Sequence, residues 1–241
     1  MIKVVSCFWN AENYISNCIR TLKNQKDKNF EVYLIDDMSN DNSVNLVKTL
    51  IQDDERFNLI VNNEKKFKLK NMDTLIETFD DEDIILELDG DDFLMGENVI
   101  GDIREVYKNN NIWLTNGSFM YTNGMDGFSS QVDVETVRTS PFRFSHLRTW
   151  KSFLWKSIPK DYFLDDDGNY FKSAADVAYT IPLLELSGSE HYRFIPKILY
   201  VYNGSSPYND HKDGSACGGL SEQTRCANII RNKNKLDKLV R

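Results

Sequence analysis

The stretch DDEDIILELDGDDF, Asp80 to Phe93, places a short apolar run between two groups of acidic residues. The run Ile84–Leu88 is typical of a buried strand, and Asp89, Asp91 and Asp92 follow it at once. Carboxylates crowded at a strand end repel one another and are costly to desolvate. A solvated turn would tolerate them, and so would a site that binds positive charge.

Strand-like and helix-like patterns alternate through the first 95 residues. Apolar runs of strand length occur at Lys3–Phe8, Glu31–Asp36, Phe57–Val61 and Asp83–Leu88, and helical spacing occurs between them over Glu12–Asn24, Val44–Ile51 and Met72–Phe79. Strands separated by helices of this length imply right-handed βαβ crossovers. The sequence therefore predicts an α/β fold with a mainly parallel sheet.

Polar side chains follow three of these strands. Asn10 comes after the first strand, Asp36 and Asp37 end the second, and the acidic group 89–92 follows the fourth. In parallel sheets, ligands bind beyond the carboxyl ends of the strands. We therefore expect a nucleotide-sized site at this edge, because three solvated turns in these places would be a less probable coincidence.

The second half of the chain has a less regular pattern. His146–Trp155 is predicted to be helical, Ala174–Leu186 to be a helix broken or restarted near Pro182, and Tyr192–Asn203 to form two short strands with a bend at proline. A polar loop over 203–219 and a basic helix over about 220–239 follow. No repeat or linker divides the chain, so a single domain spanning residues 1–241 is expected.

Composition narrows the classes of function. Of 241 residues, 41% are hydrophobic and 27% are charged, as in ordinary globular proteins. The formal net charge of −8 argues against nucleic acid or an anionic membrane as a partner, because either would favour a basic surface. No segment has the pattern of a leader peptide or a transmembrane helix. The four cysteines include no CxxC pair, so we expect no zinc site and a cytoplasmic location with reduced thiols.

The acidic group offers a way to bind phosphates. The turn after the first strand reads FWNAENY and contains neither of the glycine-rich phosphate motifs, GxGxxG and GxxxxGK[ST]. Phosphates without such a loop usually need a cation. Hard oxygen ligands suit Mg²⁺ or Mn²⁺, which are held by one or two carboxylates together with substrate phosphates. The sequence DGDD is therefore a candidate Mn²⁺ or Mg²⁺ site.

Three segments together resemble a known enzyme family. VVSCFWNAENYISNCIRTLKNQ, FEVYLIDDMSNDNS and IILELDGDDFL, in this order and spacing, are similar to family-2-type nucleotide-sugar glycosyltransferases of the A-fold. The resemblance covers residues 1–95 well. It implies a Rossmann-like three-layer α/β/α sandwich, with residues 1–95 as the nucleotide-sugar-binding half. It also implies an acceptor-binding half over 96–219, with a lid at 203–219, and a C-terminal helix over 220–241.

The resemblance assigns donor-binding roles in the first half. Asn10 and Glu12 match the Asn-x-Glu motif after the first strand. Asp37 is implied to hydrogen-bond the pyrimidine ring of the donor, and Asp36 and Ser39 to shape that pocket.

The same resemblance assigns the groups that face the diphosphate. Asp91 is implied to be the principal metal ligand, Asp89 to face the ribose or sugar, and Asp92 to help through water. Lys70 lies where the family often has a basic residue near the diphosphate, although the family's glycine-rich stretch is replaced here by NNEKKFKLKN. A solvated helix start explains Lys70 equally well.

Chemistry guides the assignments in the second half. Inverting transfer needs a general base near the acceptor hydroxyl, and Asp176, at the start of a predicted helix, resembles the family's base. The alternative is that Asp176 only interacts with the helix dipole. His211, in the predicted lid, is a candidate third metal ligand or an exposed loop histidine. Arg148 is a candidate phosphate ligand or part of a basic helix face.

These observations lead to one preferred function and two alternatives. The preferred function is a metal-dependent inverting glycosyltransferase that moves a sugar from a nucleoside-diphosphate donor, UDP first, to a hydroxyl of a glycan or other acceptor. A nucleotidyltransferase would release pyrophosphate instead. A non-catalytic module would bind the sugar nucleotide without transferring it. The acceptor and the oligomeric state are left open by the sequence.

Overall fold

The computed structural model describes residues 1–207, 209, 212 and 216–241. Within them the chain forms an eight-stranded sheet with the order β3-β2-β1-β4-β7-β6-β8-β5. The strands are β1 (Ile2–Phe8), β2 (Phe30–Asp36), β3 (Phe57–Val61), β4 (Ile84–Glu87), β5 (Phe93–Leu94), β6 (Leu114–Tyr121), β7 (Thr149–Lys151) and β8 (Tyr192–Tyr202).

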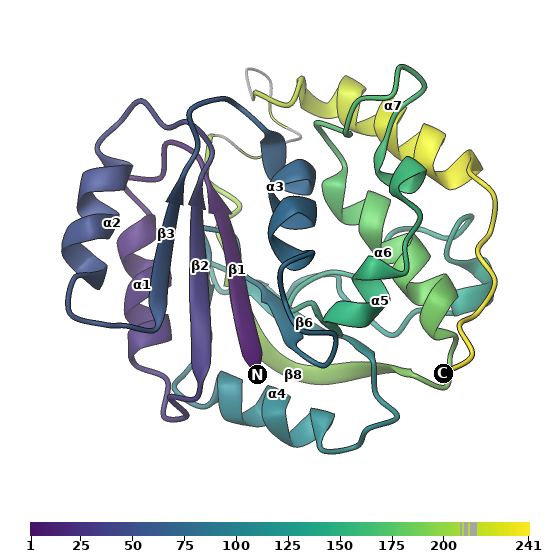
Figure 1. Cartoon of the computed structure of the whole chain (residues 1–241), viewed down its shortest axis with the longest axis horizontal. Coiled ribbons are helices and arrows are strands. Elements are labelled where there is room, and N and C mark those ends of the chain that lie inside the picture. Colours follow the sequence, from purple (N-terminus) through teal and green to yellow (C-terminus); the bar gives the residue numbers. More distant parts are fainter. Residues whose placement is uncertain (208, 210–211, 213–215) are drawn as a thin grey trace.

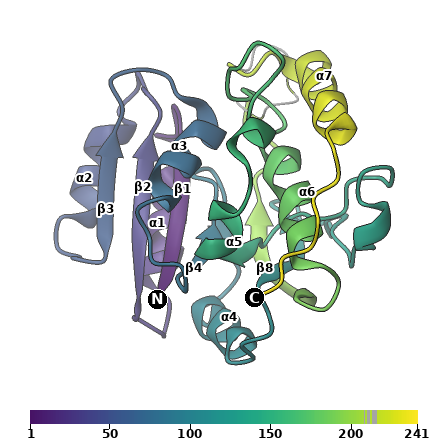
Figure 2. The same ribbon diagram turned by 45° about the vertical axis from the view of Figure 1, so that its right-hand side comes forward.

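The first four strands pair in parallel, as the sequence predicts. β1 lies between β2 and β4, and β2 pairs with β3, all in parallel (Figures 1 and 2). Neighbouring residues along a strand face opposite sides, so Val4 and Val5 enter two different hydrophobic clusters. Because both faces are covered, these strands are mainly apolar and do not alternate strictly between apolar and polar residues.

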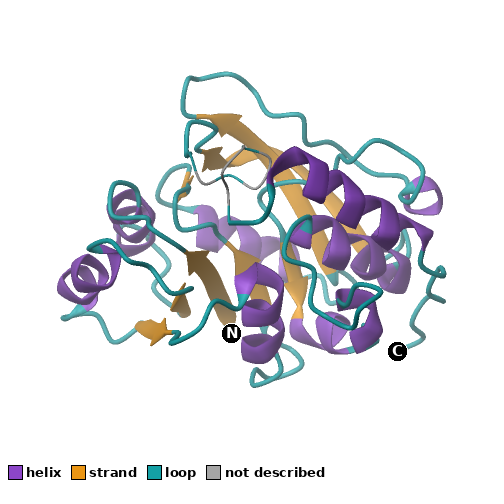
Figure 3. Cartoon of the chain, turned by 90° about the horizontal axis from the view of Figure 1, so that it is seen from above, coloured by secondary structure: helices purple, strands orange, loops and turns teal. Residues whose placement is uncertain are grey.

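Helices cover both faces of the sheet and produce three layers (Figures 2 and 3). One face packs against α1 (Ile15–Lys23), α2 (Ser43–Ile51) and α4 (Val99–Tyr107). The other face packs against α3 (Phe67–Ile76), α5 (Ser152–Lys156), α6 (Ala175–Ser187) and α7 (Gly219–Asn232). Short 3₁₀ turns occur at Val134–Thr136 and Lys160–Phe163. The predicted α/β/α sandwich is therefore confirmed.

The helix predicted over 146–155 is wrong in its first part. Residues 149–151 form β7, which pairs antiparallel with both β4 and β6, and the helix α5 begins only at Ser152. β7 joins the parallel strands of the first half to the β6–β8 pair. These sheet hydrogen bonds override the local helical spacing of apolar residues.

Two other predictions were wrong because they expected a proline to interrupt an element. α6 continues through Pro182 without a break, because every residue from Val177 to Ser187 is buried and packing stabilises the helix. Residues 192–202 form the single strand β8 instead of two short strands. Its register with β6 shifts between Ile195 and Ile198, so Pro196 falls in a bulge where no ladder N–H is needed.

The last helix is shorter than predicted. α7 ends at Asn232, and residues 233–241 continue as an irregular segment along the body of the molecule. The Arg138 guanidinium donates to the carbonyl oxygens of Ile230, Arg231, Lys233 and Asn234, which satisfies the groups at the end of the helix. None of the helices in the described residues is both long and apolar enough to cross a bilayer.

Candidate active site

A pocket of about 240 Å³ opens at the carboxyl ends of β1, β2 and β4. The first half of the chain contributes Asp37, Lys68 and Asp91 to its wall, and the second half contributes Arg148 and Asp176. The pocket therefore unites groups that are far apart in the sequence, at the edge of the sheet where the sequence predicts a site.

The loops that follow β1 and β2 are fastened to each other. The Asn10 N–H donates to Ser39 Oγ, and the Asn10 side chain accepts from the N–H of Asn40. Glu12 accepts from the N–H of Asn42 in the same way. Asn10 itself lines the pocket. The hydrogen bonds of Ser39 and Glu12 thus hold the two loops together beside the pocket.

Asp37 connects β2 to the segment before α3. Its buried carboxylate accepts hydrogen bonds from the side chains of Asn62 and Asn71 and from the N–H groups of Lys66 and Phe67. Asp36 is buried as well, and its carboxylate accepts from the Ser39 N–H. Asp37 lines the pocket. Its predicted contact with a nucleobase stays a prediction.

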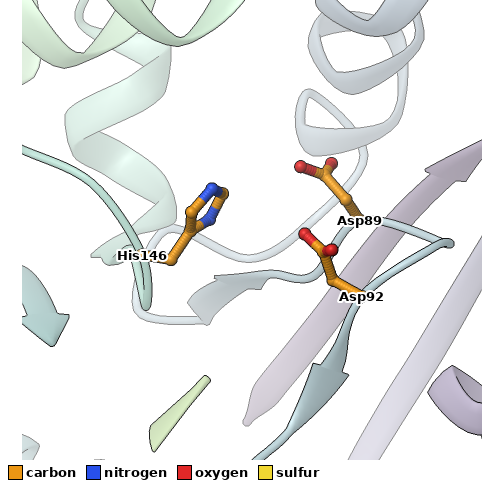
Figure 4. Close-up of side chains that lie close together, drawn as sticks. All are labelled: Asp89, Asp92 and His146. Carbon is orange, nitrogen blue, oxygen red and sulfur yellow. The ribbon is translucent and has the colours of Figure 1, made fainter. Parts of the chain in front are cut away.

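Three potential metal-ligating side chains meet in the pocket region. Asp89 and Asp92 lie in the turn after β4, and His146 lies in the segment before β7. One ligand atom of each lies within 4.8 Å of the others, and both carboxylates point toward the imidazole ring (Figure 4). Gly90 allows this turn to pack closely, because a Cβ there would lie 2.5 Å from the Phe8 Cβ.

The acidic turn contains carboxyl groups with perturbed pKa values. Asp92 is buried and accepts hydrogen bonds from the Tyr200 hydroxyl, at 2.5 Å, and from the Asn203 N–H, at 2.6 Å. Burial and the charges of Asp91 and Asp89 raise its pKa well above the ordinary value. Burial and Asp89 raise the pKa of Asp91 to about 6. A divalent cation among these groups would favour their charged forms.

His146 was not predicted to be a metal ligand. Burial and the neighbouring Arg148 hold its pKa well below the usual range, so the ring is neutral and has a nitrogen lone pair to offer. The ring stacks on Tyr200 with centroids 4.3 Å apart, which fixes its plane. The sequence contained no signal for this role, because Asp89 and His146 are 57 positions apart and meet only when β7 joins the sheet.

Beside the acidic turn lies a buried ion-pair network. Glu87 Oε2 is 2.5 Å from Arg148 Nε and accepts from the Tyr179 hydroxyl at the same distance. Lys68 Nζ is 2.5 Å from carboxylate oxygens of both Glu87 and Asp89. Although burial opposes it, Asp89 and Glu87 raise the pKa of Lys68 well above its ordinary value, so Lys68 carries a positive charge.

Arg148 has an unused donor group. Its side chain is only 2% exposed, and no described residue accepts a hydrogen bond from Nη1. This nitrogen lies 3.7 Å from Asp176 Oδ2, and both residues line the pocket. Arg148 therefore lies at the pocket in a buried ion-pair network and not on the face of a helix. Its predicted role as a phosphate ligand stays a prediction.

The prediction for Lys70 is not supported by its position. Lys70 is 43% exposed and lies 3.8 Å from Glu64, and the pocket wall contains Lys65 and Lys68 instead. In α3, Lys68 and Lys70 point in different directions because successive helical residues differ by about 100°. Only the register of the helix could have shown which of the two lysines faces the pocket.

Asp176 lies in the first turn of α6 and lines the pocket. Its side chain is 32% exposed and accepts a hydrogen bond from the N–H of Val177. Ala174, just before the helix, adopts φ 55, which turns the chain sharply into α6. His211 lies outside the described residues. Ser206, Asn209 and Cys217, from the predicted lid, line the pocket.

Comparison of the sequence with protein-family models assigns the chain to a family. The model described as Glycosyl transferase family 2 matches residues 3–170, which includes the acidic turn, His146 and Arg148. The chain belongs to glycosyl transferase family 2. An uncharacterized glycosyltransferase of Haemophilus influenzae is 26% identical over 121 residues, which are 50% of this chain and 48% of that protein. The chain thus spans about half of the length of that family relative.

Solved structures show the same fold. S. aureus TarS superimposes with a TM-score of 0.66 and 18% identity, over 86% of this chain and 37% of TarS. TarS 1–349 in complex with UDP-GlcNAc gives 0.65 and 16%, over 85% of this chain and 59% of that one. The mannosyltransferase PcManGT from Pyrobaculum calidifontis, in complex with GDP-Man and Mn²⁺, gives 0.57 and 15%, over 83% and 56%.

The family-2 fold and the donor set agree with a divalent cation. Asp89 and Asp92 offer hard oxygen ligands, and a neutral imidazole suits Mn²⁺ as well. The three ligand atoms lie close enough to share one ion after small side-chain movements. In this structure Asp89 pairs with Lys68, and Asp92 accepts hydrogen bonds from Tyr200 and Asn203. The residues present therefore fit such an ion.

Proposed function

We propose that this domain is a metal-dependent, inverting glycosyltransferase that uses a nucleoside-diphosphate sugar, with UDP as the first expectation. The observation that carries the proposal is the pocket that combines the acidic turn, the unused Arg148 nitrogen and Asp176. Family membership and structural neighbours that hold UDP-GlcNAc or GDP-Man with Mn²⁺ support the choice of donor.

In this proposal, cationic groups bind the diphosphate of the donor. Arg148 Nη1 is a buried donor that has no hydrogen-bond partner among the described residues. A phosphate oxygen would satisfy it, and Lys65 and Lys68 add positive charge to the same wall. Asp89, Asp92 and His146, the three side chains that meet, would hold the Mn²⁺ or Mg²⁺ ion together with Asp91. Asp91 lines the same pocket outside this group of three, and the family resemblance makes it the principal ligand. A bound ion there supplies Lewis-acid stabilisation of the leaving diphosphate.

Asp176 is the proposed general base. Its carboxylate takes the proton from the acceptor hydroxyl as the oxygen attacks the anomeric carbon, and the bond to the diphosphate breaks on the opposite side. Arg148, 3.7 Å away, orients the carboxylate and links the base to the diphosphate site. Attack from the side opposite the leaving group inverts the anomeric configuration.

The test is a donor panel of UDP-glucose, UDP-galactose, UDP-GlcNAc and GDP-mannose with Mn²⁺ or EDTA. We expect release of the nucleoside diphosphate with Mn²⁺, and a product of inverted configuration by NMR. Asp176→Asn should lower kcat about 10²- to 10⁴-fold with little change in the donor KM, because a positioned base contributes about that much. The control variant is Asp166→Asn, a change at an exposed aspartate that does not line the pocket.

Three results would contradict this function. Release of pyrophosphate would indicate a nucleotidyltransferase. Donor binding without release of any product from the panel would indicate a binding module. Full activity of Asp176→Asn would remove the proposed base.

A further inference from the structure

Aromatic side chains gather at the carboxyl ends of β6 and β8. Tyr121 and Tyr202 are partners in this parallel pair, and their ring centroids lie 5.6 Å apart. The Phe119 ring lies 5.3 Å from that of Tyr121 and 5.5 Å from that of Phe128. We call Phe119, Tyr121, Phe128 and Tyr202 the aromatic platform.

The platform is continuous with the pocket. Tyr202 lines the pocket together with Asp91 and Asp176. Its ring centroid is 5.5 Å from that of His146, which lies next to the acidic turn. The inner end of the platform is therefore beside the groups proposed to carry out the transfer.

The outer end of the platform is open to solvent. Phe128 is 44% exposed, and the adjoining Met125 is 63% exposed. Tyr121 and Tyr202 are half-buried, and neither hydroxyl makes a hydrogen bond to another described residue. Exposed apolar rings next to free hydroxyls, at the mouth of a polar pocket, are typical of a ligand-binding surface.

Charge differs between the two ends of the platform. At the outer end, the Arg143 guanidinium donates a hydrogen bond to the carbonyl oxygen of Phe128. At the inner end, Tyr202 lines the pocket together with the carboxyl groups of Asp91 and Asp176. A ring that reacts at the inner end therefore lies beside acidic groups, where an anionic substituent is disfavoured.

We propose that the aromatic platform binds the acceptor of the transfer reaction, and that this acceptor is an uncharged sugar ring. The inference rests on the proposed function and names its acceptor class. The C–H groups on one face of a sugar ring carry partial positive charge and stack on the negative faces of aromatic rings. The ring hydroxyls pair with the tyrosine hydroxyls, and one hydroxyl reaches Asp176 past Tyr202.

The test measures transfer to methyl glycosides of glucose, galactose, mannose and N-acetylglucosamine, with methyl glucuronide as the charged partner of methyl glucoside. Tyr121→Ala and Phe128→Ala should each raise the acceptor KM about 3- to 10-fold, the usual effect of one ring contact, without raising the donor KM. Tyr121→Phe keeps the ring and should have a smaller effect. Met95→Ala is the control, because the Met95 side chain follows β5, is 46% exposed and does not line the pocket.

Two outcomes would overturn the proposal. One is an acceptor KM within twofold of wild type in both alanine variants. The other is transfer to methyl glucuronide as efficient as transfer to methyl glucoside.

A binding measurement separates this inference from the proposed function. Saturation-transfer NMR should detect methyl glycosides on the wild type in the presence of UDP and Mn²⁺, and the signal should fall at least threefold in the Tyr121→Ala/Phe128→Ala variant. Such a loss supports the platform even when no donor in the panel is consumed, which is the failure of the proposed function. An equal signal from wild type and the correctly folded double variant would overturn the platform.

Discussion

Glu87 and Arg148 form an ion pair that is almost excluded from water. Their side chains are 1% and 2% exposed, and burial, which would raise the pKa of Glu87, is outweighed by Arg148 and Lys68, which lower it. A buried pair of this kind adds little net stability, but removal of one partner leaves a charge that burial penalises. The pair therefore fixes the position of the Arg148 nitrogen that faces the pocket.

We expect Arg148→Met to lower the free energy of unfolding by about 3–5 kcal/mol, because Glu87 keeps its charge without its main partner. Glu87→Gln added to Arg148→Met should restore a large part of that loss. Denaturant unfolding of both variants measures the difference. A single variant within 1 kcal/mol of wild type would show that the pair does not have this role.

Asp91 provides a pH-dependent prediction. Its pKa is raised from 3.8 to about 6 in the folded protein, so the wild type loses stability as pH rises from about 4 to 6, where the unfolded chain ionises first. In EDTA at pH 7.5, Asp91→Asn should unfold about 2–8 °C higher than wild type, after allowance for partial screening by water. At pH 4 the difference should disappear. An Asp91→Asn variant less stable than wild type at pH 7.5 would contradict this prediction.

At the scale of elements, the sequence predicted what depends on local periodicity. The strands and helices of the first 95 residues follow directly from it, because each element is apolar on the faces that it buries. β7, the uninterrupted β8 and the end of α7 depend on partners far away in the chain, and so they could not be predicted locally. The candidate site divides in the same way. Asp37, Asp91 and Asp176, which strand ends, a helix start and the family resemblance singled out, all line the pocket, and their roles stay predictions.

The missed site residues need the tertiary structure. Lys68 reaches Glu87 and Asp89 only in the register that α3 adopts. His146 becomes a neighbour of the acidic turn only through β7. In the sequence, Glu87 has the pattern of a polar residue on the exposed face of a strand. Its buried ion pair with Arg148 is visible only in the structure.

The segment after α7 offers a test of long-range contacts between elements. Arg138 is paired with the buried carboxylate of Glu185, at 2.5 Å, and also binds the main chain at the end of α7. We expect Arg138→Ala to cost about 3 kcal/mol and to expose residues 233–241 to proteolysis. Arg20→Ala is the control, because the Arg20 side chain donates a hydrogen bond to Asn17 on its own helix. Equal cleavage rates for the two variants would contradict the role of Arg138.

At the scale of the whole molecule, the site depends on both halves of the chain. The first half contributes the acidic turn and Lys68, and the second contributes His146, Arg148 and Asp176. The proposed diphosphate surface carries cations, and the proposed acceptor surface carries aromatic rings. The division of the sequence into a donor half and an acceptor half stays a proposal, and the proposed catalytic groups come from both halves.

The most direct test of the account is calorimetric titration of the wild type and Asp91→Asn with UDP-glucose and UDP-GlcNAc, each with Mn²⁺ and with EDTA. We predict that one of these donors binds the wild type at least tenfold more tightly with Mn²⁺, and that Asp91→Asn, although folded, loses this gain. Binding of equal strength with Mn²⁺ and EDTA, or a gain that survives in Asp91→Asn, would contradict the claim that the acidic turn joins a divalent ion to a sugar nucleotide.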